Sequence, residues 1–277
     1  MGQYHVPVNL TKREYLEPHT LGDGIKLMEF GQSGFRTMFA LGYLLANDWK
    51  GDIITIAGDY EEEGDHDPEL LKQLGIDPGE SSIYSLARGS GNKAYFEIYD
   101  QGDKTGKYDM VAWNTSKTFT DVTSRTIAAI ESADIAIWGK EKGEWSECFT
   151  KRNYSADKAM TVIVNEDLKQ VLDPRAFGDA SKTIRFMSSY FGGTMTALAT
   201  LLASACKGGG RGGGDIHSLS PAVGSWAGHR ISIQPRSAIK GYTDISATVR
   251  DVLVEAKEGK YDIPEKGRVK RLSIWED

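Results

Sequence analysis

Cysteine is scarce in this chain, with two residues among 277, Cys148 and Cys206. Their positions show no CxxC spacing, which argues against a disulfide framework or a zinc site. Two buried or free thiols are the simplest expectation.

Long apolar runs are missing as well. None approaches the roughly 18 residues that a membrane-spanning helix needs. The opening residues MGQYHVPVNLTKRE contain no apolar core of the signal-peptide type. We therefore expect a cytoplasmic protein that does not contact a membrane.

The chain has no excess of positive charge, since its net charge is −6 and its pI is about 5.5. Proteins that coat nucleic acid normally present a basic face, so nucleic acid is not an expected partner, although a local basic patch would be compatible with this balance. The contents of 40% hydrophobic and 26% charged residues are typical of a globular protein with a sizeable core.

The dominant pattern is an internal repeat. The stretch from Val8 to Ala46 is written a second time from Val164 to Ala203, with ten identities in a first block of 29 residues and seven in a second block of ten. Chance would produce about two or three matches, because common residue types are each used at roughly 5 to 7%. Self-similarity of this kind indicates duplicated structural units.

Further motifs extend the repeat over almost the whole chain. NDWKGDIITI at Asn47 matches GSWAGHRISI at Gly224, FTDVT at Phe119 matches YTDIS at Tyr242, and IAIW at Ile135 matches LSIW at Leu272. We interpret residues 1–138 as the first repeat unit, 139–153 as a linker and 154–277 as the second unit, which carries a glycine-rich insertion at 207–224.

Each unit mixes short strands with helices. Hairpins are expected at 4–16, 110–122 and 160–172, further strands at 26–30, 52–57, 94–99 and 184–186, and helices at 37–47, 68–74, 124–132, 194–205 and 248–256. Because hairpin turns predominate, we expect an α+β fold with antiparallel or mixed sheets. Duplicated units usually pack about an approximate two-fold axis, so an internal pseudo-dimer is predicted.

The insertion KGGGRGGGDIHSLSPAVG stands where the first unit has only Asn47 and Asp48. Packing alone does not predict six glycines around one arginine. A glycine-rich backbone can direct several N–H groups at one point, and a guanidinium beside it completes an anion-binding nest. Asp215 and His217 could orient a ligand or move a proton. The predicted ligand-binding residues are Gly209, Gly210, Arg211, Gly212, Gly213, Asp215 and His217.

The expected ligand of this loop is an anionic small molecule, most simply a nucleotide-like phosphate. The loop matches neither the P-loop pattern nor GxGxxG after a strand, so neither nucleotide-binding fold is indicated. A flexible surface loop without a ligand is the structural alternative.

A second candidate site is acidic. Asp59, Glu61 and Asp65 follow the strand at 52–57, and carboxylates at a strand end suit a hard cation such as Mg²⁺. The spacing is not that of an EF-hand, and a solvated acidic loop is the alternative. His5 has Thr161 as its counterpart in the second unit and is interpreted as a core or surface histidine.

Two further functions follow from these residues. One is a metal-assisted phosphohydrolase or transferase, in which the three carboxylates hold Mg²⁺ and Asp215 or His217 acts as base. The other is a non-enzymatic phage or host accessory protein that acts by contact with a protein partner.

The motifs MGQYH, GDGIKLMEF, TMTALATLLA, GRGGGD, WAGHRISI, IAGDY and YTDIS together resemble a family of small uncharacterised proteins of bacteria and their phages. Those proteins look like a single copy with one of each motif, and the resemblance implies no activity. This chain carries GRGGGD only in the second unit, at 210–215, and IAGDY only in the first, at 56–60. A site that needs both motifs must therefore form between the units.

Overall fold

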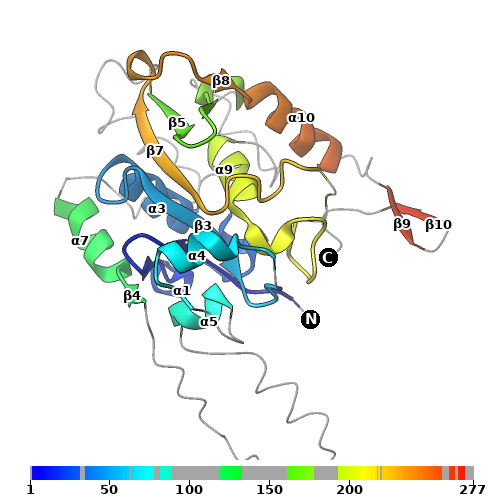
Figure 1. Cartoon of the computed structure of the whole chain (residues 1–277), viewed down its shortest axis with the longest axis horizontal. Coiled ribbons are helices and arrows are strands. Elements are labelled where there is room, and N and C mark those ends of the chain that lie inside the picture. Colours follow the sequence, from blue (N-terminus) through cyan, green and yellow to red (C-terminus); the bar gives the residue numbers. More distant parts are fainter. Residues whose placement is uncertain are drawn as a thin grey trace, which may run out of the picture.

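A computed structural model describes residues 2–31, 35–62, 64–77, 82–88, 119–132, 161–177, 193–216, 218, 220–257, 262–265 and 268–271. Its main feature is an eight-stranded sheet with the order β4-β2-β1-β3-β7-β5-β6-β8 (Figure 1). The strands are β1 His5–Asn9, β2 Glu14–Tyr15, β3 Asp52–Gly58, β4 Thr120–Asp121, β5 Thr161–Asn165, β6 Gln170–Leu172, β7 His229–Pro235 and β8 Thr243–Asp244.

Parallel and antiparallel pairs occur together in this sheet. The pairs β1–β2, β1–β3, β3–β7, β5–β6 and β5–β7 are antiparallel, whereas β2–β4 and β6–β8 are parallel. The predicted α+β class with a mixed sheet is therefore confirmed. The sheet ends on the two-residue strands β4 and β8, which offer little edge for pairing with another chain.

Both predicted hairpins flanking the sheet centre are present, and each turn is closed by an asparagine. Asn9 Oδ1 accepts a hydrogen bond from the Lys12 amide at 3.0 Å, and Asn165 Oδ1 accepts from the Leu168 amide at 2.9 Å. Asparagine side chains stabilise turns in this way. Each turn ends on a residue with positive φ, Arg13 at 55° and Lys169 at 53°.

Each of the five predicted helices is present. The predicted helix at 194–205 ends at 202 and continues as a 3₁₀ turn, because Ala203 leaves the helix to pair with Ile56 of β3. The helical elements are α1 Pro18–Leu21, α2 Leu27–Phe30, α3 Arg36–Ala46, α4 Pro68–Gln73, α5 Ile83–Arg88, α7 Thr123–Ser132, η2 Pro174–Phe177, α9 Thr194–Leu202, η3 Ser204–Cys206, η4 Arg236–Ala238 and α10 Ser246–Lys257.

The strand predicted at 26–30 is wrong, since Leu27–Phe30 is the short helix α2. Glu29 Oε2 accepts hydrogen bonds from the amides of Ile25 at 3.0 Å and Lys26 at 3.1 Å. These bonds close a helical turn and remove the amides from strand pairing. Helices α1 and α5 and the 3₁₀ turns η2 and η4 are additions to the elements that the sequence pattern predicts. The strands predicted at 94–99 and 184–186, the linker at 139–153 and most of the hairpin at 110–122 lie outside the described residues.

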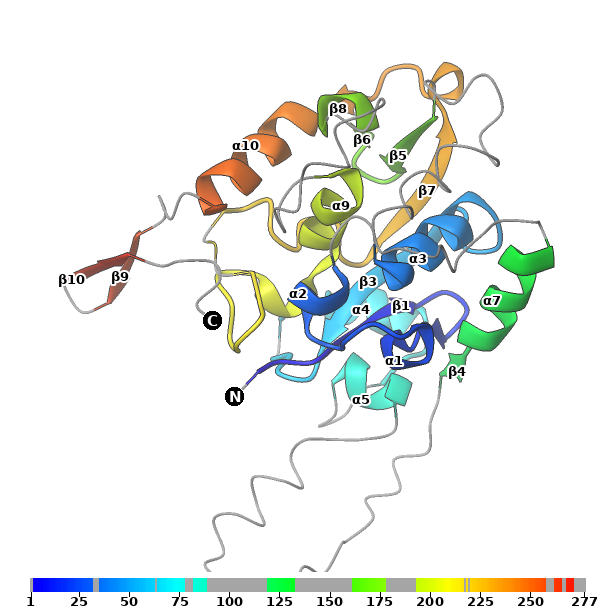
Figure 2. The same ribbon diagram turned by 180° about the vertical axis from the view of Figure 1, so that it is seen from behind.

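Helices α3 and α9 pack side by side on one face of the sheet and lie toward the viewer in Figure 2. The largest hydrophobic cluster contains Leu41 and Trp49 of the first half together with Leu201 and Trp226 of the second. On the other face, α4 and α5 cover β1 and β3 of the first half, as Leu71 and other apolar side chains pack on Val6, Val8 and Ala57. The core therefore continues across the boundary between the halves.

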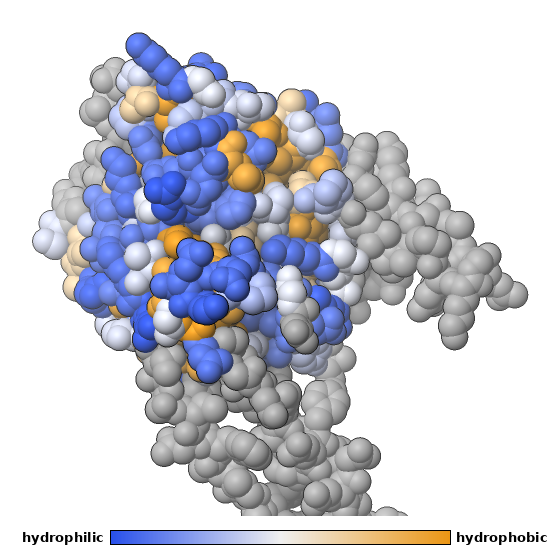
Figure 3. Space-filling model, in the orientation of Figure 1, coloured by the Kyte–Doolittle hydropathy of each residue, from blue (hydrophilic) through white to orange (hydrophobic). Residues whose placement is uncertain are grey.

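A separate two-stranded hairpin follows α10, formed by β9 Asp262–Glu265 and β10 Arg268–Arg271. The side of the described part seen in Figure 3 is mainly hydrophilic, with scattered apolar groups. No helix in the described part of the chain is long and apolar enough to cross a bilayer.

Candidate metal centre

The glycine-rich insertion of the second half packs against the first half. Gly213 forms a parallel bridge with Gly2, and the Met28 amide donates to Gly214 O at 3.0 Å. Arg211 Nη1 donates to Tyr60 O at 3.0 Å. The structure thus brings GRGGGD of the second half together with the end of IAGDY in the first.

Backbone geometry accounts for three glycines of this loop, and close approach to a neighbouring segment for a fourth. Gly208, Gly209 and Gly214 have φ values of 74°, 122° and 90°, which side chains other than glycine rarely adopt. At Gly212 an added Cβ would lie 2.6 Å from the backbone nitrogen of Gln3. The loop needs glycine both to turn and to approach Gln3, just before the first strand, closely.

The loop amides that were predicted to bind an external anion instead bind a carboxylate of this chain. The amides of Arg211 and Gly212 each donate to Asp215 Oδ2 at 2.8 Å. The Arg211 guanidinium binds both oxygens of Asp65, with Nη2 2.9 Å from Oδ1. The Asp65 carboxylate therefore accepts the hydrogen bonds that the guanidinium was predicted to give to a ligand. The amide of Gly209 donates to Cys206 O at 3.1 Å.

Gly210 and Gly213 lie in the same loop, and Gly213 is exposed. His217 lies outside the described residues.

The three acidic residues predicted to hold Mg²⁺ each have protein partners. Asp59 Oδ1 accepts from the Tyr4 amide at 2.9 Å. Glu61 Oε1 lies 2.7 Å from both Ser204 Oγ and His66 Nε2. Asp65 holds Arg211, and its Oδ2 also accepts from the Glu62 amide at 2.8 Å.

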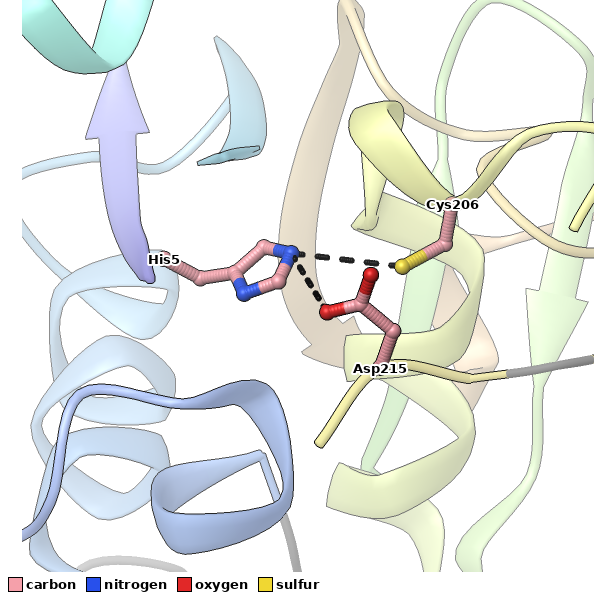
Figure 4. Close-up of side chains that lie close together, drawn as sticks. All are labelled: His5, Cys206 and Asp215. Atoms are coloured by element: carbon pink, nitrogen blue, oxygen red, sulfur yellow. Dashed lines mark hydrogen bonds and ion pairs between the residues drawn. The ribbon is translucent and has the colours of Figure 1, made fainter. Parts of the chain in front are cut away.

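Across the described residues, the three carboxylates do not form a compact group of metal-ligating atoms. A compact group does form at His5, Cys206 and Asp215, whose ligand atoms all lie within 4.8 Å of one another (Figure 4). His5 Nε2 is 3.8 Å from Asp215 Oδ1 and 3.9 Å from Cys206 Sγ. All three side chains are fully buried.

Three separate elements position these side chains. His5 begins β1, where its amide donates to Ile25 O at 2.8 Å and its residue pairs with Gly58 of β3. Cys206 ends the 3₁₀ turn η3 that follows α9. Asp215 closes the glycine-rich loop.

The Gln3 side chain supports the carboxylate of Asp215. Its amide nitrogen donates to Asp215 Oδ2 at 2.5 Å, and its amide oxygen accepts from the Tyr60 amide at 3.2 Å. The group is thus assembled from both halves of the chain and held by backbone contacts on each side.

Burial controls the protonation of this group. Desolvation lowers the pKa of His5 to about 3, and contact with the backbone of Gln3 opposes this effect only in part. Desolvation, followed by the charge of Asp215, raises the pKa of the Cys206 thiol far above its usual value. At neutral pH the imidazole is neutral and the thiol is protonated. His5 Nδ1 is buried without a hydrogen bond of good geometry.

Sequence reasoning named Asp215 as a candidate site residue but did not name His5 or Cys206. The thiol and the imidazole are separated by 201 positions, so no local spacing motif exists. The signal that could have indicated them is the presence of His5 in MGQYH and of Asp215 in GRGGGD, two motifs of the same resemblance.

Comparisons of the chain with protein-family models, curated proteins and solved structures find no match. The resemblance to small bacterial and phage proteins stays a prediction. Functional inference for this chain therefore depends on the geometry of its own residues.

Proposed function

We propose that the chain is a tandem duplicate folded as an internal pseudo-dimer. In support, the strand order outward from the centre is β3-β1-β2-β4 on one side and β7-β5-β6-β8 on the other. Each strand lies opposite its counterpart in the sequence repeat. An approximate two-fold axis between β3 and β7 would produce this order.

Matching hydrogen bonds in the two halves support the same proposal. Trp49 Nε1 donates to Glu14 at 2.8 Å, and Trp226 Nε1 donates to Gln170 at 2.8 Å. In the sequence repeat Trp49 aligns with Trp226 and Glu14 with Gln170. A corresponding pair is formed where the Glu17 amide donates to Thr123 Oγ1 at 2.7 Å and the Asp173 amide donates to Ser246 Oγ at 2.7 Å.

We further propose that the function of this protein is the binding of a transition-metal cation, with Zn²⁺ the best fit, by His5, Cys206 and Asp215. The observation that carries the proposal is a buried neutral imidazole whose Nε2 faces a thiol and a carboxylate without a short hydrogen bond to either. Imidazole, thiolate and carboxylate are the ligand types of zinc. Mg²⁺ prefers oxygen ligands and octahedral geometry, so it suits this group poorly.

The distances are close to those of a tetrahedral zinc site. Zinc bonds of about 2.0–2.1 Å to nitrogen and oxygen and about 2.3 Å to sulfur imply an N···S distance of about 3.6 Å and an N···O distance of about 3.4 Å. The observed values are 3.9 Å and 3.8 Å. A contraction of about 0.3 to 0.4 Å at the two contacts of His5 Nε2 would bring them to these values. The third pair, Cys206 Sγ and the Asp215 carboxylate, lies within 4.8 Å and would have to close to about 3.6 Å.

Outer contacts orient Asp215 for this role. Its Oδ2 accepts from Arg211 N, Gly212 N and the Gln3 amide, while Oδ1 faces the imidazole. Hydrogen bonds to the non-ligating oxygen of a carboxylate are typical of metal sites, where they fix the ligand's orientation. On this proposal the glycine-rich loop delivers one carboxylate to a metal centre.

The competing explanation is an ordinary buried polar cluster. A hydrogen-bonded His–Asp pair would have its atoms about 2.7–3.0 Å apart, closer than the 3.8 Å found here. The imidazole nitrogen that lacks a hydrogen bond is Nδ1, on the other side of the ring. A cation bound at Nε2 would replace the two long contacts of that nitrogen, to Cys206 Sγ and Asp215 Oδ1, and would deprotonate Cys206.

The other predicted functions gain less support from the contacts. Nucleotide binding at the loop and Mg²⁺ at Asp59, Glu61 and Asp65 stay predictions, since amides, guanidinium and carboxylates there bind one another. An accessory role through a protein partner also stays a prediction. Tyr4 and Leu168 are the large hydrophobic side chains exposed in the described part, and two residues do not define a docking patch.

Calorimetric titration of the chelator-treated full chain with Zn²⁺ tests the metal proposal, with native mass spectrometry to count bound ions. One equivalent is expected to bind the unmodified chain, and Cys206→Ser and Asp215→Asn are each expected to weaken binding at least tenfold. The matched control is Cys148→Ser, which removes the other cysteine and is expected to leave affinity unchanged. Equal affinity in Cys206→Ser and the unmodified chain would overturn the proposal.

A further inference from the structure

We infer that Gln3 is the positioning residue of the proposed metal centre and holds two of its ligands, His5 and Asp215, at a fixed separation. The inference rests on the metal-binding function proposed above and adds a residue that does not itself touch the cation. Gln3 is fully buried and lies two positions before His5. The side chains of both residues reach the Asp215 carboxylate, one at each oxygen.

The hydrogen-bond donors to the Asp215 carboxylate come from two different segments. Arg211 N and Gly212 N each lie 2.8 Å from Oδ2, and both belong to the loop that carries Asp215. They orient the carboxylate within the loop but move with it. The Gln3 side-chain amide, 2.5 Å from the same oxygen, belongs to the segment that carries His5. This bond therefore fixes the carboxylate relative to the imidazole, whose Nε2 is 3.8 Å from Oδ1.

Gln3 also contacts the imidazole directly, through its backbone. The Nδ1 atom of His5 is buried without a hydrogen bond of good geometry. When a histidine binds a metal through Nε2, its Nδ1 carries the proton and donates it to a neighbouring carbonyl or carboxylate, which fixes the orientation of the ring. We expect the Gln3 carbonyl to accept this bond in the metal-bound chain. One residue then orients two ligands that come from different halves.

Two glycines restrict the position of Gln3 itself. A Cβ added at Gly58 of β3 would lie 2.4 Å from the Gln3 side-chain amide, and one added at Gly212 would lie 2.6 Å from the Gln3 backbone nitrogen. The amide oxygen of Gln3 is held as well, since it accepts from the Tyr60 amide at 3.2 Å. A side chain enclosed in this way has little freedom to turn. It can therefore keep the Asp215 carboxylate at one distance from the segment before β1.

Gln3→Met tests the inference on the full chain, because methionine has a similar length and lacks both polar atoms of the amide. Calorimetric titration is expected to show a Zn²⁺ affinity about 10- to 100-fold lower, the range typical for loss of an outer hydrogen-bond partner. Co²⁺ replaces Zn²⁺ in such sites and reports its ligands through visible absorption. The thiolate-to-metal band is expected to persist, since Cys206 still binds. The d–d bands are expected to change, since Asp215 is displaced.

Gln170→Met is the matched control. It makes the same substitution in the second half and removes the hydrogen bond that Trp226 Nε1 donates to Gln170 at 2.8 Å. This variant is expected to be less stable, with the Zn²⁺ affinity and the Co²⁺ spectrum of the unmodified chain. If Gln3→Met does not fold, Gln3→Asn takes its place. Its amide is one methylene shorter and does not reach Asp215, so the same changes are expected.

An affinity of Gln3→Met within about twofold of the unmodified chain, together with unchanged d–d bands, would overturn the role of Gln3 and leave metal binding intact. Equal losses in Gln170→Met and Gln3→Met would also overturn it, because they would follow from lower stability alone. Absence of the thiolate-to-metal band from the unmodified chain would instead reject the metal-binding function, and the inference with it.

Discussion

Ile53 and Arg230 face each other at the midpoint of the three residue pairs that join β3 to β7. They also occupy the same position in the repeated stretch, Ile53 in DIITI and Arg230 in HRISI. The flanking pairs are Asp52–Ile231 and Ile54–His229. In the repeat Asp52 aligns with His229 and Ile54 with Ile231, so replacing each residue by its counterpart turns one pair into the other. A residue paired with its own counterpart is what an isologous contact between two equivalent units produces.

The buried indoles Trp49 and Trp226 provide a test of equivalent roles in the two halves. Trp226→Phe removes a hydrogen bond to Gln170 and is expected to lower the free energy of unfolding by about 1 kcal/mol, besides the effect of lost volume. Trp49→Phe is expected to cost about 2 kcal/mol, because its acceptor is the Glu14 carboxylate. Urea denaturation measures both. No loss in either variant would contradict matching roles for these residues.

The variants Gly212→Ala and Gly208→Ala distinguish the stability cost of a steric clash in the loop from the cost of backbone strain. Gly208→Ala places a side chain in open space at φ 74°, so it is expected to cost about 1 to 2 kcal/mol of strain. Gly212→Ala is expected to cost more, since its Cβ would meet the Gln3 backbone at 2.6 Å. Thermal unfolding of the two variants makes the comparison.

Gly212→Ala is also expected to weaken Zn²⁺ binding, because the clash with Gln3 displaces the loop that carries Asp215. A larger loss of stability in Gly208→Ala than in Gly212→Ala would show that the loop has room for a side chain beside Gln3.

The pair Arg211 and Asp65 anchors the loop to the first half. The Asp65 side chain is buried, and the Arg211 side chain is 22% exposed. A double-mutant cycle with Arg211→Ala and Asp65→Ala is expected to give a coupling energy of about 1 to 3 kcal/mol, reduced by the partial exposure of the arginine. Chemical denaturation of the four proteins measures it. Additive effects would mean that the pair contributes nothing as a unit.

The surroundings of His229 predict that the folded chain loses stability at acidic pH. Asn165 Oδ1 accepts from the amides of Asp167 and Leu168, so Asn165 Nδ2 must face His229 Nδ1 at 2.8 Å. This contact requires an unprotonated Nδ1, and desolvation lowers the pKa of His229 below 6.5. As the pH falls below about 6.5, the unfolded chain takes up a proton that the folded chain does not, and stability decreases.

Urea denaturation between pH 7 and pH 5 is the measurement for His229. His229→Gln is expected to lose less stability over this range than the unmodified chain, while His5 contributes the same trend to both proteins. Identical pH profiles for His229→Gln and the unmodified chain would remove His229 from this role.

Local patterns in the sequence were sufficient for most of the secondary structure. The hairpins follow from apolar alternation around Asn9 and Asn165, whose side chains close the turns whatever lies elsewhere in the chain. The segment at 26–30 shows the limit of such patterns. Its apolar content suits a strand, but the Glu29 side chain bonds the preceding amides and produces a helical turn.

The sequence by itself determined the repeat, the α+β class and the insertion as the main difference between the halves, because these depend on residue order and local periodicity. Only the tertiary structure decided which side chains meet at the proposed metal centre. His5 begins a strand, Cys206 ends a turn after α9, and Asp215 closes a loop, so their encounter depends on how the two halves pack.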